Sequence, residues 1–229
     1  MSFESPLPPY NASDPSATFL SSSCLDLLLI ELVPLAYRLA NELDASERES
    51  IAGFAENAAW NADRASENVS VGKRGLGGAA VATTRIEAKM DDDEERDAVF
   101  YRLEILGYRV GQGLVERFSR DRPRFTDTLD VIKFLCKDLW MLVFRKQIDN
   151  LKTNHRGVYV LTDNSFRPFA RMSTEAGGQA VIRAQPFLWF PCGIIRGALA
   201  SMGISASVQA ETSELPGATF QIKSIAAKS

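Results

Sequence analysis

Phe190–Gly203 reads FPCGIIRGALASMG, and this stretch lies between two groups of predicted strands, so it decides the fold class. Pro191 suits the first position of a helix because its missing N–H would have no helical partner there. Gly203 suits the other end because glycine readily adopts left-handed backbone angles. The stretch therefore predicts a helix over about residues 191–202.

Strands are predicted on the C-terminal side of this helix. Ile204–Glu211 and Ala218–Ile225 flank Leu215-Pro216-Gly217, residue types that are typical of a turn. These segments predict a β-hairpin.

A second hairpin is predicted on the N-terminal side. Val158–Thr162 and Phe166–Met172 flank Asp163-Asn164, whose side chains tolerate the left-handed angles of a tight turn. Pro168 donates no ladder hydrogen bond, so we expect the second strand of this pair at a sheet edge or a bulge.

Helices are predicted in the first part of the chain. Apolar residues recur with helical spacing over about residues 22–43, 97–120 and 127–147, and a short helix is expected over about 47–60. Helices followed by the order strand, strand, helix, strand, strand indicate an α+β fold with an antiparallel sheet.

The helix predicted over residues 22–43 is apolar on more than one face. Leu27, Ile30, Val33 and Tyr37 widen the stripe formed by the leucines at helical spacing. Such a helix needs two partners, its own core and another chain, and Pro34 would bend the path between them. We expect a dimer interface that uses Leu25, Leu28, Leu29, Leu32 and Leu39.

Two segments lack any apolar periodicity. Residues 1–19 are expected to be a flexible lead-in, and residues 62–94, rich in glycine and alanine and ending in the acidic run Asp91–Glu95, a disordered insertion. We therefore expect a single domain over residues 20–229 that the insertion interrupts. After it, Gly107 and Gly111 lie one turn apart, where a second helix backbone could approach closely.

Composition limits the classes of function. The hydrophobic fraction of 45% is enough for a sizeable core, while the net charge of −3 gives no overall positive field for nucleic acid. The N-terminus lacks the basic and apolar regions of a signal peptide, and charged residues interrupt the longest apolar run, Cys24–Leu43, so no transmembrane segment is expected.

The residue types that carry catalysis or metal binding are sparse. His155 is the only histidine, and Cys24, Cys136 and Cys192 lack metal-ligand spacing, so we expect reduced, buried thiols, a cytosolic location, and no catalytic, cofactor or metal site. The glycine-rich Gly72–Gly78 lacks the order of a phosphate-binding loop, and Asp91–Glu95 lacks that of a calcium loop.

A group of cations follows the helix predicted over residues 127–147. Arg145, Lys146, Lys152 and Arg156 could form a basic patch for an anionic membrane or an acidic partner. The simpler alternative is a solvated helix end whose cations favour the helix dipole.

Four stretches together resemble the small subunits of the TRAPP vesicle-tethering complex. Leu106–Gly111 leading into Leu114–Phe118, and Asp130–Phe134 leading into Lys137–Trp140, are similar to the subunit 3 and subunit 6 classes. Asp149–Val160, which reads DNLKTNHRGVYV, and the stretch FPCGIIRGALASMG resemble the subunit 6 type specifically. The resemblance covers about residues 20–58 and 96–226.

The resemblance implies about five helices packed on a twisted four-stranded antiparallel sheet. It implies a non-catalytic subunit that forms a heterodimer with a subunit 3 type chain. That pair would belong to a larger assembly, peripheral at cis-Golgi and ER-Golgi intermediate membranes, that tethers vesicles and exchanges nucleotide on an early-secretory Rab GTPase. The exchange surface would belong to other subunits.

One departure concerns acylation. Subunit 3 chains carry an acylated cysteine just before their third helix, where this chain reads Asp121-Arg122-Pro123-Arg124-Phe125. We therefore expect no acylation here. Two other classes of function remain open at this stage: a binding module for a hydrophobic ligand in the helical core, and a small enzyme with carboxylates or a nucleophile clustered in a pocket.

Overall fold

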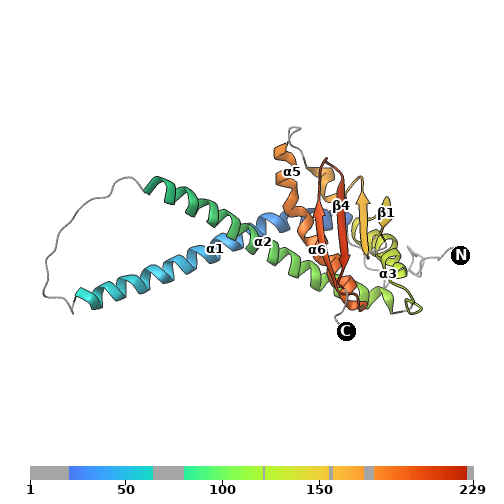
Figure 1. Ribbon diagram of the computed structural model, residues 1–229, viewed down its shortest axis with the longest axis horizontal. Helices are drawn as coiled ribbons and strands as arrows, with labels where there is room; N and C mark the ends of the chain where they lie inside the picture. The colour runs from blue at the N-terminus through green and yellow to red at the C-terminus, as the bar shows by residue number, and fades with distance from the viewer. Residues whose placement is uncertain (1–20, 64–79, 121, 155–156, 173–177, 226–229) are drawn as a thin grey trace. The chain divides into compact units, whose positions relative to one another are not determined.

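The computed structural model describes residues 21–63, 80–120, 122–154, 157–172 and 178–225, and it divides into two compact units. Unit 1 comprises residues 1–33 and 102–229, and unit 2 comprises residues 34–101. Helices α1 (Ser22–Asp63) and α2 (Ala80–Ser119) each contribute residues to both units (Figure 1).

Unit 1 contains one sheet of four strands, β1 (Asn150–Thr153), β2 (Val158–Asp163), β3 (Ala206–Glu211) and β4 (Ala218–Ser224). Their order is β1-β2-β4-β3, and every neighbouring pair is antiparallel. The predicted α+β fold and the hairpin formed by β3 and β4 are confirmed.

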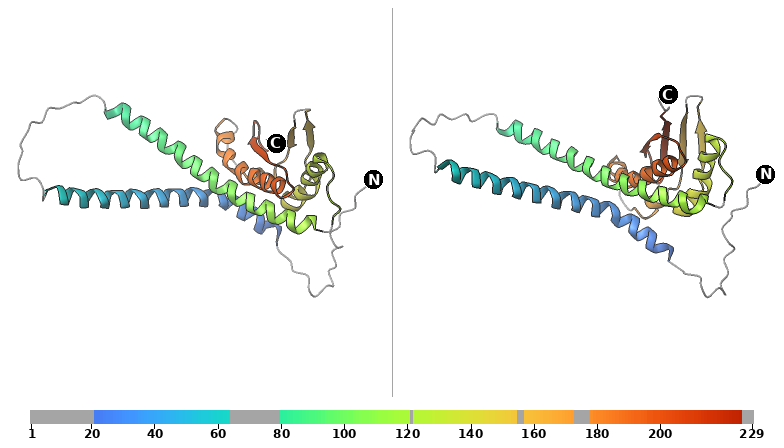
Figure 2. Two further views of the ribbon diagram at one scale, coloured as in Figure 1. Left: turned by 60° about the horizontal axis from the view of Figure 1, so that its bottom comes forward. Right: turned by 90° about the horizontal axis from the view of Figure 1, so that it is seen from below.

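The helices of unit 1 gather on one face of this sheet (Figure 2). They include α3 (Thr128–Phe134), a π-helical turn (Leu135–Leu139), α4 (Trp140–Phe144), α5 (Gly178–Ala184) and α6 (Trp189–Ser201). Strand side chains alternate between faces, so Leu161, Phe220 and Ile222 are buried under the helices. Their neighbours Val160, Thr162 and Gln221 therefore lie on the other face.

The first hairpin differs from the prediction. Residues 150–153 form its first strand and Val158–Asp163 its second, while the expected strand Phe166–Met172 is a 3₁₀ helix at Arg167–Arg171. Pro168 lies in the first turn of that helix, where its missing N–H costs nothing. Asp163 ends β2 and a turn follows at Asn164 and Ser165, where the Asp163 carboxylate accepts a hydrogen bond from the Ser165 N–H at 3.0 Å.

The helices of the first half also differ from the prediction. The two helices expected over residues 22–43 and 47–60 are the single helix α1, with Pro34 inside it. Of the segment expected to be disordered, residues 62–63 end α1 and 80–94 belong to α2, whereas 64–79 lie outside the described residues, as does the lead-in over residues 1–19. Alanine and glutamate are strong helix formers, which explains a helix without an apolar stripe.

Two further helices differ in detail. The helix expected over residues 127–147 changes to π-helical pairing at Leu135 and ends at Phe144, where Arg145 takes a left-handed φ of 61°. The π turn leaves the Cys136 carbonyl able to accept the Ile148 N–H at 3.0 Å, and this bond leads the chain towards β1. Helix α6 begins at Trp189, and Gly203 beyond its end has the expected positive φ, 82°.

Candidate interaction surfaces

Helices α2 and α6 cross with their backbones in contact within unit 1. A Cβ added to Gly107 would clash with the Phe190 carbonyl oxygen, and one added to Gly111 would clash with the Ile194 carbonyl oxygen. Gly193 and Gly197 of α6 meet the α2 backbone in the same way, through the carbonyl groups of Glu104 and Tyr108. The close approach predicted for Gly107 and Gly111 is confirmed, whereas the role of the two α6 glycines was missed.

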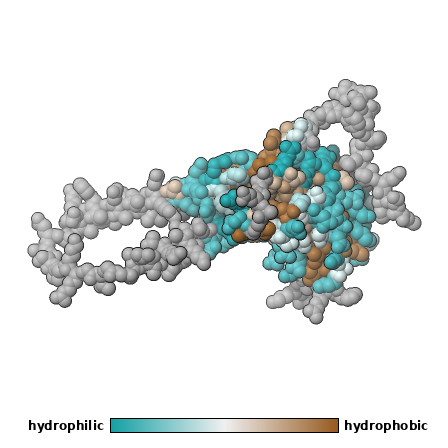
Figure 3. Space-filling view, turned by 90° about the horizontal axis from the view of Figure 1, so that it is seen from above, coloured by the Kyte–Doolittle hydropathy of each residue, from teal (hydrophilic) through white to brown (hydrophobic). Residues whose placement is uncertain are grey.

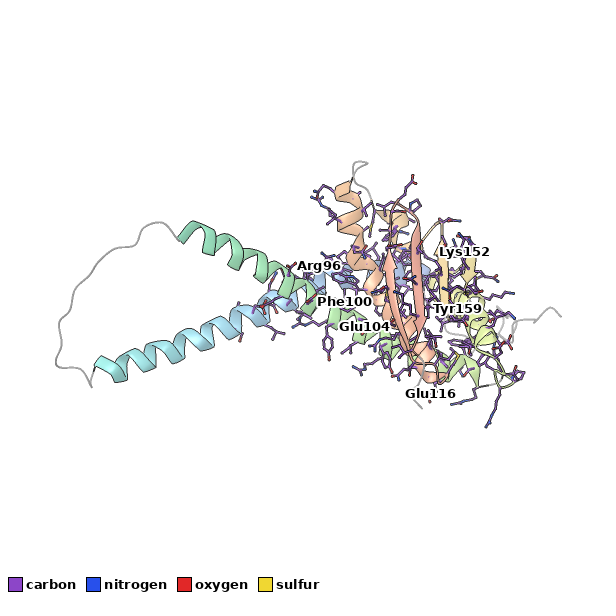
Figure 4. All side chains as sticks on the ribbon, in the orientation of Figure 1. Arg96, Phe100, Glu104, Glu116, Lys152 and Tyr159 are labelled. Carbon is purple, nitrogen blue, oxygen red and sulfur yellow. The ribbon has the colours of Figure 1, made fainter. Side chains whose placement is uncertain are left out.

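A charged pair links α2 and α6 at this crossing. Arg196 of α6 donates from Nε and Nη2 to the two carboxylate oxygens of Glu104 on α2, the second bond being 2.6 Å long. Its guanidinium also lies over the Tyr108 ring, 4.5 Å from the ring centroid. Glu104 is labelled in Figure 4. This pair fixes the register of α2 against α6.

The N-terminal turns of α1 are held to unit 1 by a second forked pair. Arg167 Nε and Nη2 donate to Asp26 Oδ1 and Oδ2 at 2.6 and 3.0 Å, and Arg171 Nη2 lies 3.6 Å from Oδ2. The hydrogen bond from Arg167 lowers the pKa of Asp26 below its ordinary value and raises the pKa of Arg167. This segment of α1 therefore has a defined orientation in unit 1.

The centre of unit 1 is filled by aromatic rings. Trp140, Phe144, Phe166 and Phe220 are each at most 1% exposed, and their centroids lie 4.4–6.3 Å apart. Such contacts are typical of a packed interior. The rings occupy the space between α4 and the sheet, so nothing in this part of the core favours the hydrophobic-ligand module.

The buried Asp163 carboxylate lies at the edge of this cluster. It accepts hydrogen bonds from Trp140 Nε1 at 2.9 Å and from Lys146 Nζ at 2.6 Å, and Lys146 also donates to Asp149 at 2.8 Å. Burial alone would lower the pKa of Lys146, but the two carboxylates outweigh burial and raise it. The bond from Lys146, with a second from the Asn164 N–H, lowers the pKa of Asp149.

This network changes the expected basic patch. Lys146 is bound to two carboxylates and does not contribute a free charge, while Arg156 lies outside the described residues. Arg145 and Lys152 are exposed. Two exposed cations would contribute only about 2 kcal/mol at an anionic membrane.

The five leucines expected at an interface have different surroundings. In unit 1, Leu29 is 7% exposed and packs in the chain's own core, so it is not available to a partner. Leu25 and Leu32 are half-buried, and Leu28 is 60% exposed. Its neighbour Leu27 is 59% exposed and was not among the expected residues.

Unit 2 shows an arrangement of its own. The small residues Ala36 and Ala40 of α1 and Val99 of α2 are at most 5% exposed, whereas Leu35, Leu39 and Leu43 are 41–51% exposed. These leucines recur every fourth residue and therefore lie along one side of α1. In unit 2 the alanines of α1 are therefore buried and its leucines are exposed. The leucines form an apolar stripe that has no partner among the described residues.

Other apolar residues are exposed elsewhere, including Ile182 on α5, at 62%. In Figure 3 apolar patches interrupt a mostly polar surface. Single exposed apolar residues are common in soluble proteins, so Ile182 needs no special explanation.

The three thiols of the described part of the chain differ in exposure. Cys136 and Cys192 are buried, and burial raises the pKa of both thiols, that of Cys136 to about 12. Cys24 is exposed on α1, contrary to expectation, because it lies on the outer side of the first turn. His155 and Gly72–Gly78 lie outside the described residues.

Metal binding and membrane spanning can likewise be judged for the described residues only. No three His, Cys, Asp or Glu side chains among the described residues are placed to hold a metal ion. In the parts of the chain that the structure describes, no helix combines the length and apolarity needed to cross a bilayer.

Sequence comparisons find relatives among the subunits of the trafficking protein particle complex. The trafficking protein particle complex subunit 6b of Danio rerio is 52% identical over 130 residues, which cover 57% of this chain and 82% of that protein. The human subunits 6B and 6A are 54% and 51% identical over 121 and 120 residues, covering 53% and 52% of this chain and 75% and 74% of those proteins.

A solved structure is also similar. It is a trafficking protein particle complex subunit 3 from Naegleria fowleri covalently bound to palmitic acid, with a TM-score of 0.49 and 15% identity over 64% of this chain and 92% of that one.

The family described as transport protein particle (TRAPP) component matches residues 25–225, nearly the whole of the described chain. With relatives of the subunit 6 type at about half identity, the chain belongs to the TRAPP component family.

Proposed function

We propose that this TRAPP subunit is a non-catalytic structural component that pairs with a subunit 3 type chain through α1. The observation that supports this most strongly is the set of α1 leucines left without a partner in the described residues, Leu28 in unit 1 and Leu35, Leu39 and Leu43 in unit 2. Burying an apolar side chain contributes roughly 1.5–3 kcal/mol, so the exposed leucines of each unit would add binding energy to a contact formed by that unit.

The proposed setting is a larger assembly that tethers vesicles and exchanges nucleotide on an early-secretory Rab GTPase. There the subunit contributes binding energy and position, and it reaches cis-Golgi and ER-Golgi intermediate membranes as part of the complex. The names of the relatives, each a subunit of a trafficking protein particle complex, support this setting.

The test is a comparison of two charge insertions at equally exposed apolar positions of unit 1. Leu28→Asp should weaken binding to a purified subunit 3 type chain at least about tenfold, because the new carboxylate would be desolvated against an apolar partner. Ile182→Asp, at a site 62% exposed against 60% for Leu28, should leave binding unchanged. Binding is measured by biolayer interferometry.

Circular dichroism melts of both variants separate a loss of folding from a loss of binding. Equal binding by Leu28→Asp and by the unsubstituted chain would contradict the α1 interface in unit 1. The matched substitution Leu39→Asp tests unit 2 independently, since Leu39 is 43% exposed.

A further inference from the structure

The two edges of the sheet in unit 1 are not equivalent. In antiparallel ladders, alternate residues exchange both backbone hydrogen bonds with one neighbouring strand, and the residues between them point both groups the other way. The bond from the Ile225 N–H to the Ser205 carbonyl sets this alternation for β3 and β4. Ala206, Val208 and Ala210 therefore point their backbone groups away from the sheet.

The β3 edge is covered at one of these positions. Gln185 Nε2 donates to the Ala210 carbonyl oxygen at 2.9 Å, and α6 and the 3₁₀ turn Gln185–Leu188 pack beside β3. Covering an edge with a helix and a side chain is a common way to prevent further strand pairing.

The β1 edge is open in the described part of the chain. The Asn154 N–H donates to the Val158 carbonyl oxygen at 3.0 Å, which assigns Asn150 and Lys152 to the ladder with β2. Leu151 and Thr153 therefore direct two N–H donors and two carbonyl acceptors outwards. Strand β1 contains no proline or bulge that would prevent a further strand from pairing.

The side chains along this edge define what would pair with it. Lys152 is exposed and lies on the β1 side of the sheet (Figure 4), on the face that the helices leave uncovered. Leu151 is half-buried against the core on the opposite face. Arg145 is exposed and precedes Lys146, whose ammonium binds Asp149, the residue before β1.

We propose that β1 accepts an extended segment of another protein as a fifth strand, with a carboxylate opposite Lys152 and an apolar residue opposite Leu151. Main-chain hydrogen bonds would supply affinity, and the alternating side chains would supply specificity. A second copy of β1 fits poorly, because antiparallel pairing would place Lys152 opposite Asn150, Lys152 or Asn154 of that copy, none of them acidic.

The experiment uses the full chain labelled with ¹⁵N and two synthetic peptides. One alternates valine with glutamate, and the control peptide alternates valine with lysine. The acidic peptide should slow amide hydrogen exchange of Leu151 and Thr153 at least about tenfold at saturation, since exposed edge amides become hydrogen-bonded. The basic peptide should leave both rates unchanged.

Two substitutions at one position separate the edge from other surfaces. Thr153→Pro removes an outward N–H without removing a bond to β2, and should abolish protection by the peptide, whereas Thr153→Val keeps the N–H and should preserve it. Lys152→Glu should remove the preference for the acidic peptide, and Lys223→Glu on the central strand β4 should not.

Protection of Leu151 and Thr153 in the unsubstituted chain is read directly, so the result does not depend on how well the proline variant folds. Unchanged exchange of both amides at millimolar acidic peptide would overturn the proposal. Equal protection by both peptides, or peptide binding that persists in a folded Thr153→Pro variant, would overturn it as well.

Discussion

The Asp163 carboxylate receives hydrogen bonds from three donors in unit 1, Trp140 Nε1, Lys146 Nζ and the Ser165 N–H. A buried carboxylate is costly unless it is paired and hydrogen-bonded, and here both conditions hold. Because the donors come from α4, from the segment after α4 and from the turn after β2, this one group links the aromatic core to the sheet.

Asp163→Asn should therefore lower the free energy of unfolding by about 2–4 kcal/mol, because it removes the charge that faces Lys146 inside the protein. Asp130→Asn is the control, since Asp130 pairs with Lys133 at 3.2 Å where both side chains are about half exposed. The control should cost less than about 1 kcal/mol. Urea unfolding followed by tryptophan fluorescence measures both, and equal losses would contradict the role assigned to burial.

Acid should weaken the contact between Asp26 and Arg167. The pKa of Asp26 in the folded chain lies below its ordinary value of 3.8. A carboxyl with a depressed folded pKa stabilises the fold fully above the unfolded pKa, and this contribution is lost as pH falls through the folded pKa. Stability should therefore begin to fall below about pH 4 and continue to fall at lower pH.

The variant Asp26→Asn isolates this residue. It should be less stable than the unsubstituted chain at neutral pH, and the difference between the two should shrink as pH falls below 3.8. Thermal melts at a series of pH values measure the difference. A difference in stability that stays constant down to pH 2 would contradict the lowered pKa of Asp26 and with it the stabilising pair with Arg167.

At the level of helices, the crossing of α2 and α6 depends on four glycines. The carbonyl of Tyr108 lies where a Cβ of Gly197 would be, so Gly197→Ala must push the two helices apart. Overpacking of this kind costs about 3 kcal/mol or more when backbone is the obstacle. The expected result is a large fall in melting temperature.

Gly113 of α2, the other helix of the crossing, provides the matched control. A Cβ built there meets nothing within 4 Å, so Gly113→Ala should raise stability by about 0.5–1 kcal/mol through helix propensity alone. Opposite signs for the two alanine substitutions, measured by denaturant unfolding, are the expected outcome. A mild effect at Gly197 would mean that the helices can separate without loss.

The same crossing shows how far the sequence alone could predict the fold. Gly107 and Gly111 are conspicuous because they interrupt an apolar helix one turn apart, and a close approach follows from physical chemistry. Gly193 and Gly197 have the same spacing within FPCGIIRGALASMG, but a single sequence does not show that they pair with glycines 86 residues earlier in the chain. The long-range partner therefore required the structure.

The wrong prediction of the first hairpin has a different cause. Phe166–Met172 is apolar enough to suggest a strand. In the structure this segment contains a 3₁₀ helix, and tertiary packing buries the side chains of Phe166 and Phe169. Asn150–Thr153 is polar because only Leu151 turns towards the core, so its strand carries almost no apolar signal. Edge strands with one buried side chain are difficult to recognise from periodicity.

For the whole molecule, α1 belongs to both units, and in each unit it exposes leucines. The spacing of apolar residues in the sequence predicts that α1 is apolar on two faces. It does not show which leucines belong to the core and which to the surface, because Leu28 and Leu29 look alike in sequence. Burial separates them: Leu29 is core and Leu28 is surface. Assembly with a partner would thus use surface that folding alone leaves exposed.

If assembly is the contribution of this subunit, the isolated chain should not accelerate nucleotide release from an early-secretory Rab GTPase. Release requires a surface that disturbs the phosphate- and magnesium-binding loops of the GTPase. The exposed features of the described residues include the leucines on α1 and the β1 edge of the sheet, both of which are suited to binding another chain. Any effect on exchange should then arise through binding energy that stabilises the complex.

Fluorescent-nucleotide release measures this with the chain alone, with its pair with a subunit 3 type chain, and with the full assembly in the presence and absence of the subunit. We expect the spontaneous rate for the chain alone and for the pair. In the full assembly, Leu28→Asp should reduce exchange only as far as it reduces incorporation of the subunit, because it acts on pairing. Acceleration by the purified chain alone would contradict a non-catalytic role.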